Sequence, residues 1–235
     1  MTSLILLAAS MAGTSSSHAL QIFETPDDGD GYSLLILNGI IEFNDSKRID
    51  KFLQEQAREG TPVAMIMTSS GGGLEETPRI AEAMINASNL LAKKFKNKRN
   101  LFAVNIECSS ACTALTARLT SGRDPKSLEM LITNSSKWGF HSPVNYVNKK
   151  VSPIADVAER DRLIAKQISY YTKAGVSTKW LTANAEMFKT AKMTDLEARK
   201  LCAEKSLVIP PTSCVPDQDI TELITRKLVP SAKKP

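Results

Sequence analysis

The sequence predicts an α/β protein with a mostly parallel sheet and helices packed outside it. Apolar runs of strand length, such as residues 63–67 and 102–106, alternate along the chain with segments in which apolar residues recur at helical spacing. The 235 residues suffice for one domain with a full hydrophobic core, and no internal repeat is visible. Strands and helices that alternate in this way build βαβ units, which set the strands parallel.

The N-terminal residues are expected to be a targeting segment. Residues 4–12 form a short apolar run, followed by small polar residues and by the small-x-small pattern Ser17-His18-Ala19. Although no Lys or Arg precedes the run, this order is typical of a secretory signal peptide. We therefore expect residues 1–19 to be removed, the mature chain to begin at Leu20, and the protein to be periplasmic or secreted. Residues 20–31 are expected to form a flexible lead.

The first half of the mature chain is expected to supply three strands and their helices. Residues 32–37 form an apolar strand that continues irregularly to residue 41. Asn44 or Asp45 caps a helix that ends at Gly60. Residues 63–67 form the second strand, and the helix after it has an apolar stripe at residues 80, 84, 87 and 91. The third strand, residues 102–106, turns sharply into a short buried helix at residues 111–120.

The second half is expected to contain two short strands and three helices. The strands are residues 128–133 and 138–143. Ser152 and Pro153 open a long helix that stops at Gly175, and residues 177–188 form a short one. Residues 194–197, Thr-Asp-Leu-Glu, have the pattern of a capping box and are expected to start a further helix.

Charge and cysteine content narrow the functional classes. The net charge of +5 is mild, and few aromatics interleave with the basic cluster at residues 93–99, so we expect no nucleic-acid binding. Of the four cysteines, Cys202 and Cys214 flank a Pro-Pro loop and are expected to form a disulfide. Cys108 and Cys112 are either a bridge that stiffens a turn or two small core residues.

We expect no metal site. Neither cysteine pair has the Cys-x-x-Cys spacing of a metal site, and only one histidine of the sequence lies outside the targeting segment.

Ser110 lies at the corner between the third strand and its helix. This geometry exposes a side chain at the carboxyl end of the sheet and directs the free N–H groups of a helix N-terminus at whatever binds there. A serine in this place is a candidate nucleophile, because the helix end stabilises an oxyanion during acyl transfer. On this stretch alone, a helix-capping serine without catalysis is the simpler interpretation.

Two further features follow neighbouring strands. Residues 69–73, Ser-Ser-Gly-Gly-Gly, come after the second strand, and no Gly-Lys-Ser/Thr follows them, which argues against a Walker phosphate loop. His141 follows Gly139 and Phe140 at the end of a later strand. Because open α/β sheets place their sites at the carboxyl ends of strands, we expect the glycine loop, Ser110 and His141 to meet.

The order of these motifs resembles the proteolytic subunit of the Clp protease. The shared order is strand, Ser-x-Gly-Gly, helix, strand, serine corner, helix, strand, His-x-Pro, long helix and Met-x-x-x-Glu-Ala. The sequence is most similar to the exported branch of the Clp/crotonase superfamily, whose members carry a Cys-x-Ser-Ala-Cys corner and a Gly-Phe-His segment; here these are residues 108–112 and 139–141. The resemblance covers residues 32–207 and implies a spiral of βαβ units. We expect residues 208–235 to form a C-terminal extension, which the disulfide expected from the cysteine pattern ties to the domain.

The resemblance implies a role for each site residue. Ser110 would be the nucleophile and His141 the general base, with the N–H groups of Gly71 or Gly72 and of Ala111 as the oxyanion hole. The family's catalytic aspartate does not carry over, because residues 190–192 are Thr-Ala-Lys. Glu186 is therefore our candidate for the third member of the triad.

These expectations define an exported Clp-like serine hydrolase, a peptidase that forms an acyl-enzyme and needs no metal or organic cofactor. An exported protein meets no ATP, so we expect short or unfolded peptides as substrates and no ATP-driven unfoldase as partner. Because relatives form rings or trimers, we expect a homo-oligomer.

Three alternatives remain from the sequence. The missing aspartate favours a catalytically degenerate relative that binds a peptide or partner. A Ser–Lys peptidase of the signal-peptide-peptidase type would use Lys149 or Lys150 as its base. A crotonase-like acyl-CoA enzyme would use the glycine loop and leave Ser110 and His141 without a role.

Overall fold

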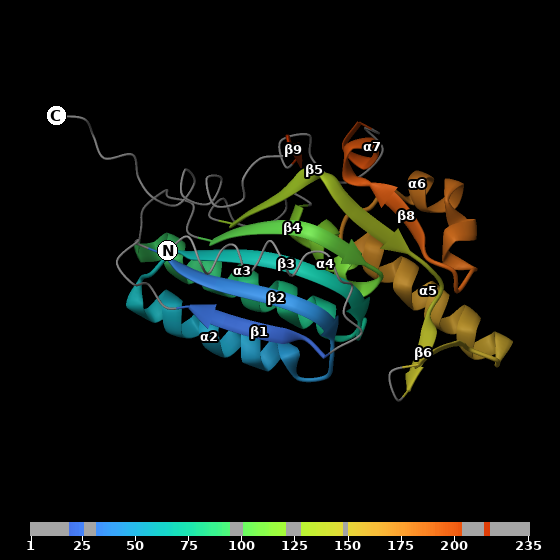
Figure 1. Cartoon of the computed structure of the whole chain (residues 1–235), viewed down its shortest axis with the longest axis horizontal. Helices are drawn as coiled ribbons and strands as arrows, with labels where there is room; N and C mark the ends of the chain where they lie inside the picture. Colours follow the sequence, from blue (N-terminus) through green and yellow to red (C-terminus); the bar gives the residue numbers. More distant parts are fainter. Residues whose placement is uncertain are drawn as a thin grey trace.

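The structure is a computed structural model that describes residues 19–25, 32–94, 101–120, 128–147, 150–203 and 214–216 (Figure 1). The signal peptide expected at residues 1–19, apart from Ala19, lies outside these residues, as does most of the expected C-terminal extension. Among the described helices, none has the length and apolar character that a membrane crossing requires.

The described part of the chain is built on a seven-stranded sheet in the order β1-β2-β3-β4-β5-β8, with β9 paired to β5. The strands are β1 (Gln21–Thr25), β2 (Ser33–Ile41), β3 (Val63–Gly72), β4 (Leu101–Ser109), β5 (Leu128–Phe140), β8 (Thr194–Glu197) and β9 (Cys214–Val215). Strands β2 to β5 are parallel, and β1 and β8 are antiparallel to their neighbours. The expected α/β class with a mostly parallel sheet is therefore confirmed.

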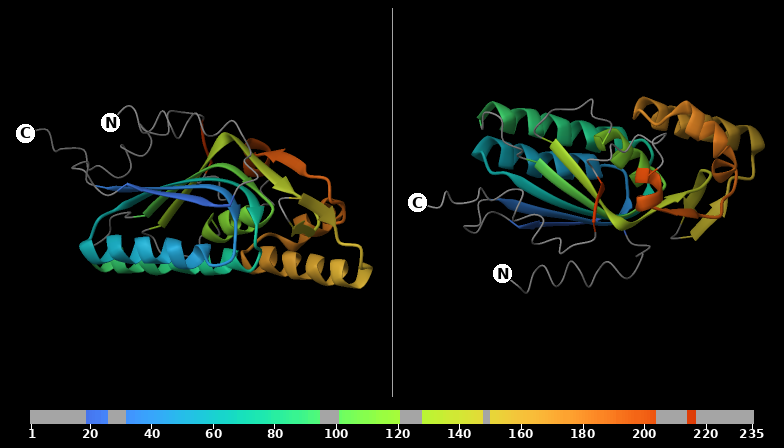
Figure 2. Two further views of the ribbon diagram at one scale, coloured as in Figure 1. Left: turned by 60° about the horizontal axis from the view of Figure 1, so that its bottom comes forward. Right: turned by 90° about the horizontal axis from the view of Figure 1, so that it is seen from above.

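The helices follow the strands along the chain. They are α2 (Asp45–Glu59), α3 (Glu76–Lys94), α4 (Ala111–Thr120), α5 (Val157–Lys173), α6 (Thr178–Ala183), the 3-10 helix η1 (Ala185–Phe188) and α7 (Ala198–Ala203). Helices α2 and α3 lie side by side against one face of the sheet (Figure 2). Helix α2 turns the apolar residues Ile49, Phe52 and Leu53 into the core, and it ends at Gly60, whose left-handed conformation (φ 83°) closes the last turn.

The core has two parts. The first packs the apolar face of the early strands against α2, α3 and α4. The second is an aromatic cluster that joins β5 to α5, α6 and η1, with Phe140 at its centre. The Phe140 ring lies 6.0 Å from Tyr171, 5.5 Å from Trp180 and 6.0 Å from Phe188, measured between ring centroids. This second part fixes α5 against the end of β5.

Several elements differ from expectation because tertiary pairing overrides local signals. Part of the expected flexible lead forms β1, which pairs with β2. Ser152 and Pro153, expected to open the long helix, belong instead to β7 (Lys150–Pro153), which pairs with β6 (Val144–Val147). Helix α5 instead begins after Asp156, whose carboxylate accepts the Glu159 N–H at 2.8 Å. The expected helix start at Thr194–Glu197 is strand β8, which pairs with the outer edge of β5.

The sheet ladders change register at one level, which we call the bulge line. The shifts lie at Asn38 between β2 and β3, at Met67 between β3 and β4, and at Asn105 between β4 and β5. Asn38 pairs with Thr68, and Met67 pairs with Asn105, so the three irregularities are neighbours across the sheet. Gly71 and Gly72 on β3, Ser110 directly after β4 and His141 directly after β5 all lie beyond this line, toward the carboxyl ends of the strands.

Candidate active site

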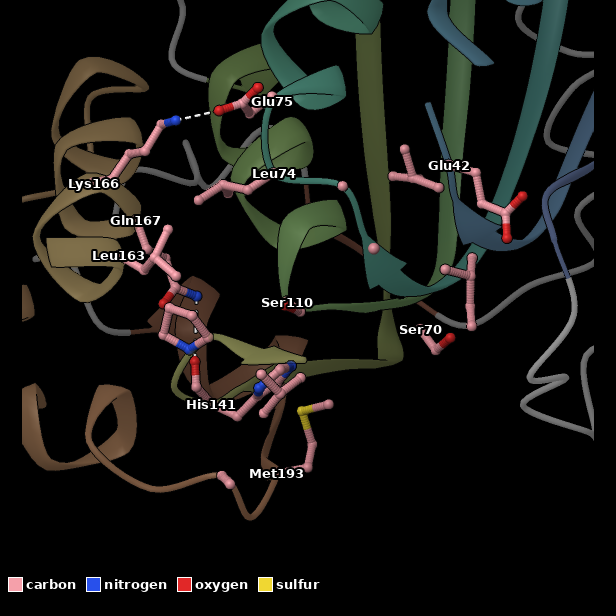
Figure 3. Close-up of a pocket in the computed structure, with 17 residues that line it drawn as sticks. Glu42, Ser70, Leu74, Glu75, Ser110, His141, Leu163, Lys166, Gln167 and Met193 are labelled. Atoms are coloured by element: carbon pink, nitrogen blue, oxygen red, sulfur yellow. Dashed lines mark hydrogen bonds and ion pairs between the residues drawn. The ribbon is translucent and has the colours of Figure 1, made fainter. Parts of the chain in front are cut away.

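A cavity of about 610 Å³ opens at the carboxyl ends of β3, β4 and β5 (Figure 3). Ser110, His141 and Gly72 all line it. Its remaining wall is largely apolar and includes side chains from β2, from the loop before α3, from α5 and from the segment before β8, namely Ile40, Ile41, Leu74, Leu163 and Met193. The chain thus brings the predicted serine and histidine to one cavity.

Ser110 has the backbone conformation of a sharp strand-to-helix corner. Its φ of 53° lies in the left-handed region, which is uncommon for a residue with a Cβ. The Ser110 N–H donates to the carbonyl oxygen of Gly139 at 2.7 Å. The Ser110 carbonyl oxygen lies 2.5 Å from the hydroxyl of Thr113 and 3.1 Å from that of Tyr171, and these two hydroxyls also share a hydrogen bond with each other. Both main-chain polar groups of the corner are therefore held.

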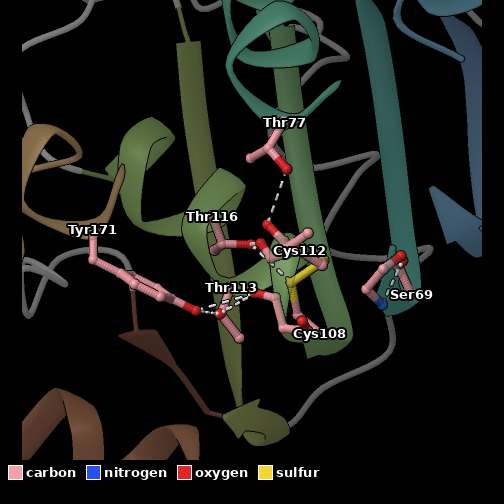
Figure 4. The surroundings of a disulfide bond; sticks show 10 residues. Ser69, Thr77, Cys108, Cys112, Thr113, Thr116 and Tyr171 are labelled. Carbon is pink, nitrogen blue, oxygen red and sulfur yellow. Dashed lines mark hydrogen bonds between the residues drawn. A yellow bond between two sulfur atoms is a disulfide. The ribbon is translucent and has the colours of Figure 1, made fainter. Parts of the chain in front are cut away.

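A disulfide between Cys108 and Cys112 spans this corner (Figure 4). Of the two alternatives for this pair, a bridge or two small core residues, the structure has the bridge. Both cysteines are fully buried. Among the described residues there is no free cysteine, and Cys214 is disulfide-bonded. The Cys202 side chain lies outside the described residues, so its pairing with Cys214 stays a prediction.

The glycine loop packs directly against the serine corner. Gly71 and Gly72 have φ of 108° and 127°, a region that favours glycine. A Cβ placed on Gly71 would lie 2.6 Å from the Ser110 Cβ and 3.3 Å from the Ala111 nitrogen. The Gly71 N–H donates to the Ser69 hydroxyl at 3.2 Å. The glycine loop and the first N–H of α4 thus lie beside the serine, and their role as an oxyanion hole stays a prediction.

His141 is 8% exposed, and its Nδ1 lies 2.5 Å from the carbonyl oxygen of Ser142. Because a carbonyl oxygen only accepts, Nδ1 carries the proton and the neutral ring keeps its lone pair on Nε2. Burial lowers the pKa of His141 below its ordinary value of 6.5, and the hydrogen bond to Ser142 opposes this only in part. The geometry therefore leaves a neutral imidazole with a basic Nε2. Within the described residues, Ser110 and His141 make no direct hydrogen bond.

The structure does not bring Glu186 to this histidine. Glu186 lies on η1 with an 84% exposed side chain that pairs with Lys189 at 2.7 Å. The short helix buries Phe188 instead and turns Glu186 outward. Thr190, in the segment of residues 190–192 that lacks the expected aspartate, accepts the Ser142 N–H through its carbonyl oxygen at 2.7 Å. The carbonyl oxygen of Ser142 thus binds His141 Nδ1, where the third member of the triad was expected to bind.

Lys166 is the described lysine that lines the cavity, and the sequence did not single it out. Its ammonium pairs with Glu75, which also lines the cavity, so the ion pair joins α5 to the loop before α3 (Figure 3). The hydrogen bond with Glu75 raises the pKa of Lys166 and lowers the pKa of Glu75, so Lys166 stays protonated and is not a base. Of the lysines proposed for a Ser–Lys site, Lys149 lies outside the described residues and Lys150 is the first residue of β7.

The cavity has other polar groups that sequence reasoning missed. Gln167 lines it while only 3% exposed, and its side chain donates to the His141 carbonyl oxygen at 3.3 Å. No motif marks such a contact, because its acceptor is a main-chain atom. Among the described residues, no group of three or more His, Cys, Asp or Glu is arranged to hold a metal ion.

No protein-family model matches the sequence, and no curated protein matches it. Among solved structures, the chain is similar to a mutant of ClpP1 from Listeria monocytogenes, with a TM-score of 0.49 and 14% sequence identity. The match covers 79% of this chain and 92% of that chain.

Proposed function

We propose that this chain is an exported, Clp-like serine hydrolase that cleaves peptides through an acyl-enzyme formed on Ser110. One observation carries the proposal: a strained serine corner and a buried histidine with a free Nε2 lone pair face the same cavity. The motif order that resembles the Clp proteolytic subunit supports it as well. The buried disulfide at the corner supports an oxidising compartment, hence a periplasmic or secreted protein.

The reaction would proceed in two halves. Ser110 Oγ attacks the substrate carbonyl carbon while His141 Nε2 accepts the hydroxyl proton. The negative oxygen of the tetrahedral intermediate accepts hydrogen bonds from the N–H of Ala111 and from the N–H of Gly71 or Gly72. The Gly71 N–H can take this role only after its hydrogen bond to the Ser69 hydroxyl breaks. The C–N bond breaks as His141 returns the proton to the leaving amine. Water then repeats the sequence on the acyl-enzyme and regenerates Ser110.

The missing carboxylate sets the expected rate. The Ser142 carbonyl orients His141 but carries no charge to stabilise the imidazolium, and loss of the carboxylate from a complete triad lowers kcat by roughly 10⁴-fold. We therefore expect slow turnover of amides and easier acylation by activated esters. Self-association into a homo-oligomer is part of the same proposal, with short or unfolded peptides as substrates.

Labelling with a fluorophosphonate probe tests this function. The wild type should be labelled, and Ser110→Ala should not. The matched control is Ser109→Ala, which removes the neighbouring, 5% exposed serine and should leave labelling in place. Labelling that survives Ser110→Ala, or that disappears in Ser109→Ala alone, would contradict the assignment.

A second candidate is a protein that binds peptides at this cavity without cleaving them. Two observations favour it: within the described residues His141 has no carboxylate partner, and it makes no direct hydrogen bond with Ser110. In that case the wild type would not be labelled, whereas peptide affinity, measured by calorimetry, would be equal in the wild type and Ser110→Ala.

A further inference from the structure

We infer that Gln167 and Tyr171, one turn apart on α5, are positioning residues that clamp the main chain of Ser110 and His141 at their working separation. The inference rests on the proposed function, because it concerns how the two reacting side chains are held. Neither residue touches the reacting atoms in this role. Each acts through a carbonyl oxygen next to one of the two catalytic side chains.

The contacts that carry the inference come from a single helix. The buried residues of α5 are Gln167 and Tyr171, which are 3% and 1% exposed. Gln167 Nε2 donates to the His141 carbonyl oxygen at 3.3 Å, and the Tyr171 hydroxyl, which also hydrogen-bonds to the Thr113 hydroxyl, donates to the Ser110 carbonyl oxygen at 3.1 Å. The buried part of α5 is thus the part that holds the two catalytic segments.

The spacing of the two residues makes one rigid element span two strand ends. Ser110 follows β4 and His141 follows β5, so separate segments carry them. Residues four apart on a helix lie on one face and are separated by about 6 Å along the axis. Because the helix fixes that distance, it also fixes the distance between the two carbonyl oxygens, and with it the approach of His141 to Ser110.

A purely structural role explains these polar groups less well. The ring of Tyr171 already packs against Phe140 and Phe188, at 6.0 and 5.6 Å between centroids, and a phenylalanine would keep that packing. Gln167 leaves its Oε1 buried without a hydrogen-bond partner among the described residues, which costs stability that an apolar side chain of similar length would not. Burial raises the pKa of Tyr171, so the phenol keeps its proton and remains a donor.

The test uses full-length protein with Tyr171→Phe, Gln167→Met and the double variant. The matched control is Tyr170→Phe, which makes the same chemical change one residue away, on the side of α5 that faces α3 and α4. We expect kcat on an activated ester, and the rate of fluorophosphonate labelling, to fall about 10–100-fold in each single variant with KM unchanged, because a displacement of about 1 Å has that effect. The double variant should lose less than the product of the two single losses, since both residues serve one geometry. The control should match the wild type.

The midpoint of thermal unfolding separates positioning from folding. A kcat loss with a folded protein at the assay temperature supports the clamp. Unchanged kcat in both single variants, or a loss that only follows the unfolded fraction, would overturn it.

A nuclear magnetic resonance titration decides the clamp even if the wild type proves inactive. The sequence has two histidines, and a His18→Gln variant assigns their signals. Releasing the His141 carbonyl should loosen its segment, admit water and raise the pKa of His141 in Gln167→Met but not in Tyr170→Phe. An inactive wild type that shows this rise would refute the proposed function and keep the clamp; an unchanged pKa of His141 would overturn the clamp.

Discussion

Replacing Gly71 by alanine should damage the candidate site more than its size suggests. The new Cβ would lie 2.6 Å from the Ser110 Cβ and 2.8 Å from the Ser109 carbonyl oxygen, whereas ordinary contacts begin at 3.4 Å. Relief therefore requires a shift of about 0.8 Å between the loop and the serine corner. Neither side yields easily, because two of the three nearest atoms belong to the main chain of the corner and Ser110 is held at both its N–H and its carbonyl.

The magnitude follows from two effects. Alanine at a φ of 108° stores strain of about 1–3 kcal/mol, which lowers the melting temperature by roughly 2–12 °C in a protein of this size. The shift also moves an oxyanion donor relative to Ser110, and loss of one such donor lowers kcat by about 10²–10³-fold.

The matched control is Gly73→Ala. A Cβ on Gly73 would meet its nearest atoms at 3.5–3.9 Å, an ordinary contact distance. The assay compares the fluorophosphonate labelling rate and the melting temperature of the two variants. If Gly71→Ala is labelled as fast as Gly73→Ala and melts at the same temperature, the packing of the loop against the serine corner does not serve catalysis as argued.

Two other predictions follow from the described contacts, and a third follows from the sequence. Because burial lowers the pKa of His141, kcat/KM should rise with pH to a plateau with its midpoint below 6.5, and a midpoint above 6.5 would contradict the assignment of His141 as base. Burial by itself would raise the pKa of Glu76, but hydrogen bonds from Ser46 and Arg79 outweigh it and lower the pKa below 4.5. The ionised Glu76 carboxylate thus stabilises the fold above pH 4.5, and this stabilisation is lost as the pH falls through the lowered pKa. Glu76→Gln should therefore lower the free energy of unfolding, measured by urea unfolding, by about 1–3 kcal/mol at pH 7 and by less in acid. A difference that does not depend on pH would contradict this. Mass spectrometry of a non-reduced digest should find Cys202 linked to Cys214, and free thiols at both positions would refute that pairing.

The sequence predicted the succession of strands and helices along the chain better than the ends of these elements. Residues 128–133 and 138–143 read as two strands, and β5 is one strand whose ladder to β4 breaks between Ile132 and Lys137. The local pattern registered the irregularity, whereas continuity depends on partners elsewhere in the chain. The same holds for β8, where pairing with the edge of β5 outweighs a local capping pattern.

In the candidate site, too, the sequence predicts some groups and misses others. Ser110, His141 and the glycine loop were found because their residue types mark chemistry and strand ends place them together. The groups that hold them escaped prediction, because the Ser142 and Ser110 carbonyls are main-chain atoms that every residue has. Glu186 lies a few residues before the segment where the resemblance implies an aspartate, but η1 directs its side chain into solvent.

The bulge line gives the sheet two zones that respond differently to insertions and deletions. Side chains along a strand alternate between faces, so one residue gained or lost in a strand moves every later side chain to the opposite face. At the bulge line the ladders already change register, and pairing on the amino-terminal side, such as Leu35 with Met65, does not depend on the register beyond it. A length change there would re-aim the cavity-facing ends of the strands while the core beneath α2 and α3 kept its packing. The fold thus provides a place where the reach and direction of the site can diverge between related chains without rebuilding the domain.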